Sequence, residues 1–266
     1  MTRRRLDAEL VRRGLVSSRA EAQDAVRAGL VSVAGAPARK AASMVADDAP
    51  LRLAGPTRRF VSRGGDKLQA ALNRWPIDPA GVACLDAGAS TGGFTDCLLR
   101  AGAAQVVAVD VGYGQLAWEL RTDERVEILE RTNVRTLTPA SVPFAPSLVV
   151  ADLSFISLRL VAETLVRVAA ADAIFVVLVK PQFEAGAQDV RRGGVVRDPA
   201  VWARVLEEII EAFGAAGAPA AAAMASPIVG PAGNVEFLLW AAKGADPGMR
   251  PDIDAAVAEG EAVRGP

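Results

Sequence analysis

The sequence predicts an α/β protein with a doubly wound, Rossmann-like parallel sheet and a small N-terminal α+β domain. One observation is a series of apolar runs, separated by stretches with helical periodicity, at residues 82–85, 106–109, 147–151 and 174–179. Fully apolar strands that alternate with helices are typical of a parallel sheet covered on both faces. A glycine-rich turn after the first run and an uneven distribution of charge along the chain support this prediction.

Charge divides the chain into a basic part and an acidic part. Residues 1–63 hold 13 Lys and Arg against 6 Asp and Glu, a net charge of +7, and the remaining 203 residues hold 17 against 25, a net charge of −8. A basic module on an acidic body indicates binding of a polyanion. We expect a basic domain over residues 1–60, a larger domain over residues 61–243 and a C-terminal tail of unknown role over residues 244–266, with a linker turn at Gly55-Pro56.

The composition excludes several classes of protein. The chain has no histidine, which removes the commonest general base, the usual metal ligand and every Ser-His-Asp mechanism. Its longest apolar stretch, residues 160–179, is interrupted by Glu163, Arg167 and Asp172, so no membrane span is expected. No signal-peptide pattern follows the basic N-terminus. We therefore expect a cytoplasmic protein that binds neither metal nor membrane.

The N-terminal domain is predicted to contain two short helices and a small hairpin. Residues 7–13 have helical apolar spacing and end at Gly14, which can adopt a left-handed conformation. A second helix is expected from a capping box at Ser18 to Gly29, and residues 31–37 alternate and turn like a hairpin. A solvated charged face without a ligand is one interpretation of the many arginines here.

This domain also resembles a known RNA-binding module. Its segments 5–7, 13–19 and 29–35 look like the αL-motif RNA-binding domain first known from a small-subunit ribosomal protein. That resemblance implies contacts with RNA phosphates, which position a substrate without reading its sequence. The candidate RNA-binding residues are Arg3, Arg4, Arg5, Arg13 and Arg19.

The loop after the first apolar strand is predicted to bind a cofactor that contains a nucleoside. Glycines let its backbone turn tightly and approach a ligand, and the helix that follows offers unpaired N–H groups. Asp110, directly after the second strand, can accept hydrogen bonds from ribose hydroxyls. The candidate cofactor-binding residues are Asp86, Gly88, Ser90, Gly92, Gly93, Phe94 and Asp110.

The same loop is compatible with other kinds of protein. Gly88-x-Ser90-x-Gly92 also fits the nucleophile elbow of α/β-hydrolases, but that serine needs a histidine base, which the chain lacks. A dinucleotide-dependent dehydrogenase stays open, because a glycine-rich turn by itself has low specificity. A tight turn that binds no ligand stays open as well.

Charged residues at further strand ends separate these alternatives. Asp152 follows the third apolar strand, Lys180 follows the fourth, Lys67 lies before the first and Glu236 opens the final strand. Any one of them is typical of a solvated charge at a strand end. Four charges that converge on one crevice at the strand ends would instead indicate an active site.

These motifs resemble those of the TlyA, or hemolysin A, family of ribosomal RNA 2′-O-methyltransferases, and the likeness covers nearly the whole chain. It lies in five segments, residues 62–68, 86–94, 151–157, 179–184 and 230–236. The catalytic part is similar to the FtsJ-type ribose methyltransferases, whose fold is a class I methyltransferase sheet. Their Lys-Asp-Lys-Glu tetrad maps onto Lys67, Asp152, Lys180 and Glu236.

The resemblance implies an enzyme that transfers a methyl group from S-adenosyl-L-methionine to a ribose 2′-hydroxyl of ribosomal RNA. It suggests cytidines of the large ribosomal subunit and, for members with so long an N-terminus, of the small subunit too. Lys180 would accept or steer the hydroxyl proton, while Asp152 and Glu236 would hold the two lysines. Two alternatives are a non-catalytic RNA-binding assembly factor and a membrane-active hemolysin.

Overall fold

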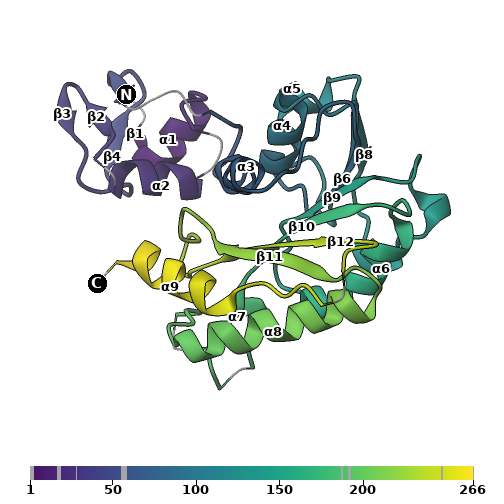
Figure 1. Cartoon of the computed structure of the whole chain (residues 1–266). Helices are drawn as coiled ribbons and strands as arrows, with labels where there is room; N and C mark the ends of the chain where they lie inside the picture. Colours follow the sequence, from purple (N-terminus) through teal and green to yellow (C-terminus); the bar gives the residue numbers. More distant parts are fainter. Residues whose placement is uncertain are drawn as a thin grey trace. The chain divides into compact units, whose positions relative to one another are not determined.

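The structure, a computed structural model, describes residues 3–16, 19–27, 29–54, 59–186, 188–190, 193–246 and 248–265. The chain divides into two units, Met1–Arg58 and Arg59–Pro266 (Figure 1). Among the described residues, no helix has the length and apolar character needed to cross a membrane.

The first unit is built on helices α1 (Leu6–Arg12) and α2 (Arg19–Arg27), which pack against each other. Strand β1 pairs antiparallel with β4, and β3, β2 and β5 form a separate sheet. A small apolar core, to which both helices and two of the strands contribute, holds the unit together. The strands are β1 (Arg3–Arg5), β2 (Val31–Val33), β3 (Ala36–Pro37), β4 (Met44–Ala46) and β5 (Leu51–Leu53).

The two predicted helices and the predicted hairpin are present in this unit. Strands β1, β4 and β5 were not predicted; β1 consists of three arginines, which give no apolar signal. Gly14 has a φ of +67°, as its predicted place at a helix end requires. Ser18 and the linker turn Gly55-Pro56 lie outside the described residues.

The second unit contains a seven-stranded sheet in the order β11-β12-β10-β9-β6-β7-β8. Its neighbouring strands pair in parallel, except that β12 is antiparallel to both β10 and β11. This is the predicted Rossmann-like sheet. The strands are β6 (Ala83–Ala87), β7 (Gln105–Val109), β8 (Val126–Leu129), β9 (Leu148–Ala151), β10 (Ile174–Val179), β11 (Ala220–Ala225) and β12 (Phe237–Ala242).

Helices cover both faces of this sheet (Figure 1). Two groups of helices, one on each face, pack on the sheet, and an apolar core lies beneath each group. In β10, Val176 and Leu178 belong to the core beneath the first group, whereas Phe175, Val177 and Val179 belong to the core beneath the second. Burial on both faces explains why this strand is a continuous apolar run. The first group is α3 (Gly64–Arg74), α4 (Gly93–Arg100) and α5 (Trp118–Arg121), and the second is α6 (Ala162–Val168), α8 (Pro199–Ala215) and α9 (Ile253–Arg264).

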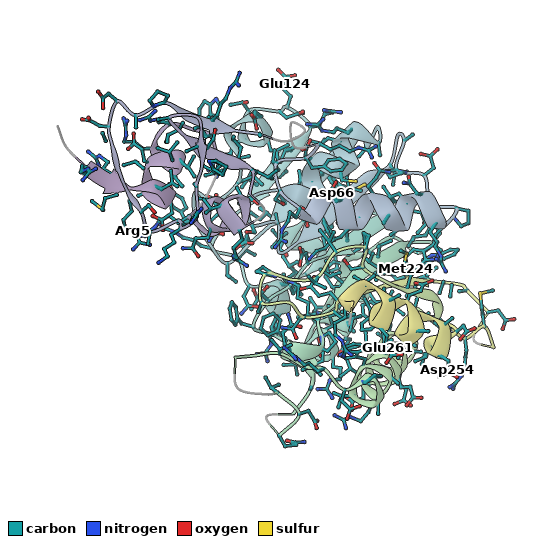
Figure 2. The ribbon with its side chains drawn as sticks, turned by 90° about the vertical axis from the view of Figure 1, so that its left-hand side faces the viewer. Arg5, Asp66, Glu124, Met224, Asp254 and Glu261 are labelled. Atoms are coloured by element: carbon teal, nitrogen blue, oxygen red, sulfur yellow. The ribbon has the colours of Figure 1, made fainter. Side chains whose placement is uncertain are left out.

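The segment after Lys243, to which no motif was assigned, ends in helix α9. This helix packs on β11 and α8, with Ala256 and Gly260 buried. A Cβ atom at Gly260 would lie 2.9 Å from Val235, so the glycine permits a close approach. Asp254 and Glu261 are exposed on this helix (Figure 2).

The order of the strands places a crevice at one edge of the sheet. The chain leaves β6 toward β7 and β8 on one side, and returns to β9, β10 and β12 on the other. In open α/β sheets, ligands bind at this switch point, beyond the carboxyl ends of the strands. The loops after β6, β7, β9 and β10 therefore define the region in which to look for a site.

Candidate functional site

The glycine turn after β6 is shaped by contacts that leave no space for side chains. Gly88 has a φ of +87°, and a Cβ atom there would lie 2.9 Å from the carbonyl oxygen of Asp152. Gly92 has a φ of +95°, and its Cβ would overlap the side chain of Leu120. A Cβ on Gly93 would overlap Ser62 Oγ. The glycines thus allow the turn to pack against β9, α5 and the segment before α3.

Two cavities adjoin this turn. The larger, about 540 Å³, extends over the ends of β6, β7 and β9, and the predicted residues Gly88, Ser90, Asp110 and Asp152 all line it. The smaller, about 150 Å³, shares Gly88, Ser90, Asp152 and Ser154 with the larger one. Shared walls mean that a ligand in the larger cavity would border the smaller one. The residues that the small cavity adds include Gly93, Phe94 and Lys180.

The Asp110 carboxylate joins the loop after β6 to the loop after β7, and both loops line the larger cavity. Its Oδ2 accepts a hydrogen bond from the backbone N–H of Ser90 at 2.8 Å, and its Oδ1 accepts one from the N–H of Gly112 at 2.7 Å. A carboxylate oxygen has two lone pairs, so each of these oxygens can accept a further bond from a ligand.

Asp86 and Gly92, predicted to contact a cofactor, line neither of these cavities. Asp86 is fully buried and accepts hydrogen bonds from the backbone N–H of Thr95 at 2.9 Å and from its hydroxyl at 2.7 Å. Burial raises the pKa of Asp86 to about 7, and the nearby carboxylate of Asp152 acts in the same direction. Asp86 thus supports the start of α4 beneath the loop, and Gly92 serves the backbone turn.

Lys180 and Asp152 form an ion pair at the wall of the smaller cavity. Lys180 Nζ lies 2.5 Å from Asp152 Oδ1 and donates a hydrogen bond to Ser154 Oγ at 2.9 Å. The contact with Asp152 is a close ion pair rather than a well-directed hydrogen bond, because that carboxylate oxygen is among the buried atoms without a hydrogen-bond partner. Lys180 is only 8% exposed, so its ammonium is directed by these neighbours rather than by solvent.

Lys67 and Glu236 form a second ion pair, and both side chains are buried. Two strand registers bring the pairs to the same edge of the sheet. Val179 pairs with Phe237, so Lys180 and Glu236 occupy adjoining positions just beyond the paired ends of β10 and β12. Asp152 directly follows β9, which pairs in parallel with β10.

The start of α3 completes this arrangement. A Cβ atom on Gly64 would lie 3.6 Å from Asp152 Oδ2 and 3.5 Å from the ring of Phe94. Lys67 is three residues further along the same helix and reaches Glu236 from there. The structure thus brings all four predicted catalytic residues to one edge of the sheet, as two ion pairs.

The site also contains residues that were not singled out from the sequence. Ser154 bonds Lys180, and the ring of Phe155 lies 5.0 Å from the ring of Phe183. Phe155 is 90% exposed and has a φ of +63°, which is uncommon for an aromatic residue. An exposed ring of this kind offers a face on which a nucleobase can stack. In the sequence, only their position directly after Asp152 could have identified Ser154 and Phe155 as residues of the site.

In the first unit, two buried carboxylates organise the predicted arginines. Asp7 accepts hydrogen bonds from Arg5 at 2.8 Å and from Arg19 at 3.1 Å. Arg5 and Arg19 lower the pKa of Asp7. Arg4 lies at the limit of ion-pair distance, 4.0 Å, from Glu9. Exposed guanidinium groups held in this way can face phosphates with little loss of side-chain freedom.

Arg13 is less exposed than Arg4, Arg5 and Arg19, and all three nitrogens of its guanidinium are engaged within the unit. Its Nε donates to Glu9 at 2.7 Å, and its Nη1 and Nη2 donate to the carbonyl oxygens of Ala49 at 2.7 Å and Asp47 at 2.8 Å. Arg12, which was not predicted, also donates to Glu9 but is about half exposed. Arg12 and Arg13 together lower the pKa of Glu9.

Comparisons with known proteins match both units. The family described as FtsJ-like methyltransferase matches residues 60–243, and the S4 domain matches residues 4–49. The 16S/23S rRNA (cytidine-2′-O)-methyltransferase TlyA of Mycobacterium tuberculosis (strain H37Rv) is 53% identical over 239 residues, which cover 90% of this chain and 89% of that protein. The "Putative rRNA methyltransferase YqxC" of Bacillus subtilis (strain 168) is 46% identical, over 90% of this chain and 87% of that protein.

A solved structure is similar over almost the full length. The "Putative hemolysin from Streptococcus thermophilus" has a TM-score of 0.80 and 37% sequence identity, covering 99% of this chain and 97% of that chain. Its similarity therefore includes both units of the fold.

Proposed function

Because this chain belongs to the TlyA family of FtsJ-like ribosomal RNA methyltransferases, we propose that it methylates a cytidine ribose 2′-hydroxyl of ribosomal RNA in the cytoplasm. The observation that supports this most is the pair of ion pairs Lys180–Asp152 and Lys67–Glu236 beside the glycine turn. Their place at the carboxyl edge of the sheet is where this fold binds its ligands.

The larger cavity fits the proposed cofactor, S-adenosyl-L-methionine. A volume of about 540 Å³ lies within the range of small-molecule sites, and the wall is mainly apolar with a few polar groups. Asp110 has oxygens with lone pairs for the ribose hydroxyls, and Gly88 lines the wall beside it. S-adenosyl-L-methionine would supply an electrophilic methyl group on a sulfonium centre.

Lys180 would act on the ribose hydroxyl. A hydroxyl is a weak nucleophile, and its proton must leave as the new O–CH₃ bond forms and the S–CH₃ bond breaks. The Lys180 side chain can receive or steer this proton, and its contacts with Asp152 and Ser154 fix its direction. In-line attack also demands accurate positioning, which a rigid, buried site provides.

The second ion pair would balance the charge of the site. Lys67 and Glu236 are buried together, which keeps a second cation close to Lys180 without leaving a charge unpaired. The first unit would bind ribosomal RNA or ribosomal subunits through Arg3, Arg4, Arg5 and Arg19. Such contacts bring the substrate to the enzyme without specifying the methylated nucleotide.

The test uses the purified full-length chain, tritiated S-adenosyl-L-methionine and ribosomal subunits that lack 2′-O-methylation. We expect tritium in ribosomal RNA and a new 2′-O-methylcytidine on mapping of both subunits. The Lys180→Ala variant is the matched control and should give none. If the wild-type protein binds RNA but transfers no label to either subunit, the chain is a non-catalytic RNA-binding factor and the proposal is wrong.

A further inference from the structure

Three residues of the segment after β10 contact the segment after β9. Lys180 contacts Asp152 and Ser154, and Phe183 packs on Phe155. The third residue, Glu184, lies furthest from the strands. These two segments carry the two halves of the Lys180–Asp152 ion pair, so the geometry of that pair depends on how firmly the segments are joined.

Glu184 fastens the far ends of the two segments. One of its carboxylate oxygens accepts a hydrogen bond from Ser157 Oγ at 2.5 Å, and the other accepts one from the backbone N–H of Leu158 at 2.7 Å. Arg159 returns the contact, because its Nη2 donates to the backbone carbonyl of Glu184 at 3.0 Å. The join therefore involves both side chain and backbone.

The short helix that carries Glu184 depends on these contacts for its stability. Helix α7 (Pro181–Glu184) has only four residues, too few for a helix to be stable by its own hydrogen bonds. Lys180 is its N-cap residue. The orientation of Lys180 is thus set at one end by β10 and at the other by a helix that depends on outside contacts.

Burial of the Glu184 carboxylate costs free energy of folding, which points to a role besides stability. The side chain is 5% exposed, and burial raises the pKa of Glu184 despite the hydrogen bonds from Leu158 and Ser157. Arg159 is the nearby cation, with its Nε 3.8 Å away, and it also binds Glu208 on α8 at 2.6 Å. An apolar residue would be cheaper to bury but could not bind the donors of Ser157 and Leu158.

We propose that Glu184 is a positioning residue for methyl transfer, which holds the segment after β10 against the segment after β9 and so fixes Lys180 relative to Asp152. This inference rests on the proposed function. Glu184 lines neither cavity beside the glycine turn, so it acts through Lys180 rather than on substrate or cofactor. Displacements of about 1 Å at a catalytic group can reduce a rate about 100-fold.

The test compares Glu184→Gln with Glu208→Gln in the full-length protein. Both variants remove a carboxylate that binds Arg159, but only the first weakens the join between the segments, because glutamine has a single acceptor oxygen and cannot accept from both Ser157 and Leu158. We expect Glu184→Gln to lower the single-turnover rate of methyl transfer by at least about tenfold, with S-adenosylhomocysteine affinity unchanged within about twofold. Glu208→Gln should retain the wild-type rate.

A second variant and a second measurement distinguish a positioning role of Glu184 from a purely structural one. Ser157→Ala should lower the rate in the same direction, and the double variant should lose less than the two single effects combined, because both residues serve one contact. Hydrogen exchange at the Leu158 amide should be faster in Ser157→Ala and Glu184→Gln than in the wild type.

Three results would overturn the inference. One is a wild-type rate in Glu184→Gln. Another is a parallel loss of rate, cofactor affinity and thermal stability, which would mean that Glu184 serves only the fold. The third is unchanged exchange at Leu158. An inactive wild-type protein would instead count against the proposed function, and the exchange measurement would still report on the join.

Discussion

Lys180 Nζ lies 2.5 Å from Asp152 Oδ1, although the two residues belong to segments that follow different strands. The parallel pairing of β9 and β10 makes this contact possible, because both strands end at the same edge. The chemistry proposed for Lys180 therefore depends on the sheet as well as on the residue.

Lys180→Ala is expected to abolish methyl transfer. Removal of a general acid or base lowers rates by about 10²- to 10⁴-fold, whereas cofactor affinity should stay within a few-fold because Lys180 lies on the wall of the smaller cavity only. Lys180→Arg is the sharper variant, since arginine keeps the charge but does not lose its proton. Single-turnover kinetics and calorimetric titration with S-adenosylhomocysteine measure both quantities. A fully active Lys180→Arg protein would exclude proton transfer to this residue.

Lys67→Ala should destabilise the fold. It leaves Glu236, which is 2% exposed, as a buried carboxylate without its cation, and breaking such a pair costs about 3–5 kcal/mol. The double variant Lys67→Met/Glu236→Leu should recover much of this loss, because it removes both charges. Urea denaturation measures the free energies of unfolding. Equal stability of Lys67→Ala and the wild type would mean that the pair is not buried in solution.

Gly92→Ala should reduce stability more than Gly81→Ala does. Both glycines have positive φ, +95° and +71°, so alanine is strained at either position, with a cost of about 1–3 kcal/mol. At Gly92 the new Cβ would also overlap Leu120, whereas nothing lies within 4 Å at Gly81. Thermal unfolding of the two variants measures the difference. Equal midpoints would show that the packing of α5 against the turn is loose.

Asp86 should make stability depend on pH. Its pKa is raised by burial to about 7, so between roughly pH 4 and pH 7 the native state holds a proton that the unfolded chain has released. The free energy of unfolding should therefore fall as pH rises through this range, by about 1.4 kcal/mol for each pH unit.

Asp86→Asn should remove this part of the slope, because asparagine does not ionise and can still accept the hydrogen bonds from Thr95. Asp172→Asn, at an exposed position, is the matched control and should leave the slope as it is. Denaturant midpoints measured from pH 4 to pH 8 provide the comparison. A slope that persists in Asp86→Asn would assign it to other groups.

A chain that begins at Arg59 should fold, bind S-adenosylhomocysteine and lose most of its RNA affinity. The boundary between the two units lies there, and the predicted phosphate contacts all lie before it. Affinity for ribosomal RNA at several salt concentrations is the measurement, since lost phosphate contacts flatten the salt dependence. Unchanged RNA affinity would show that the S4 domain is not the anchor.

The sequence predicted which charged residues gather at the carboxyl edge of the sheet better than it predicted the contacts that support them. Asp152, Lys180 and Glu236 could be found because each follows or precedes an apolar strand. Lys67 lies in α3 and was indicated by the family resemblance. Asp86 and Gly92 were expected to contact a cofactor, which stays a prediction; in the structure Asp86 bonds Thr95 of α4, and a Cβ atom on Gly92 would meet Leu120 of α5. A motif identifies residues of a turn without showing which of them face the ligand.

Other features had no signal in the local pattern. Strand β11 has the sequence Ala-Ala-Ala-Ala-Met-Ala, and alanine favours helix unless tertiary pairing overrides it. The role of Glu184 depends on Ser157 and Leu158, more than twenty residues earlier. Contacts between distant segments follow from packing and become visible only in three dimensions.

The reversed direction of β12 has a consequence for the synthesis of the protein. Glu236 stands before this strand rather than after it, and it reaches the catalytic edge only once β12 has paired with β10. A nascent chain that ends before β12 lacks Glu236, the partner of Lys67, and its β11 has no strand to pair with. The Lys67–Glu236 ion pair and the place of β11 in the sheet therefore both depend on the synthesis of β12.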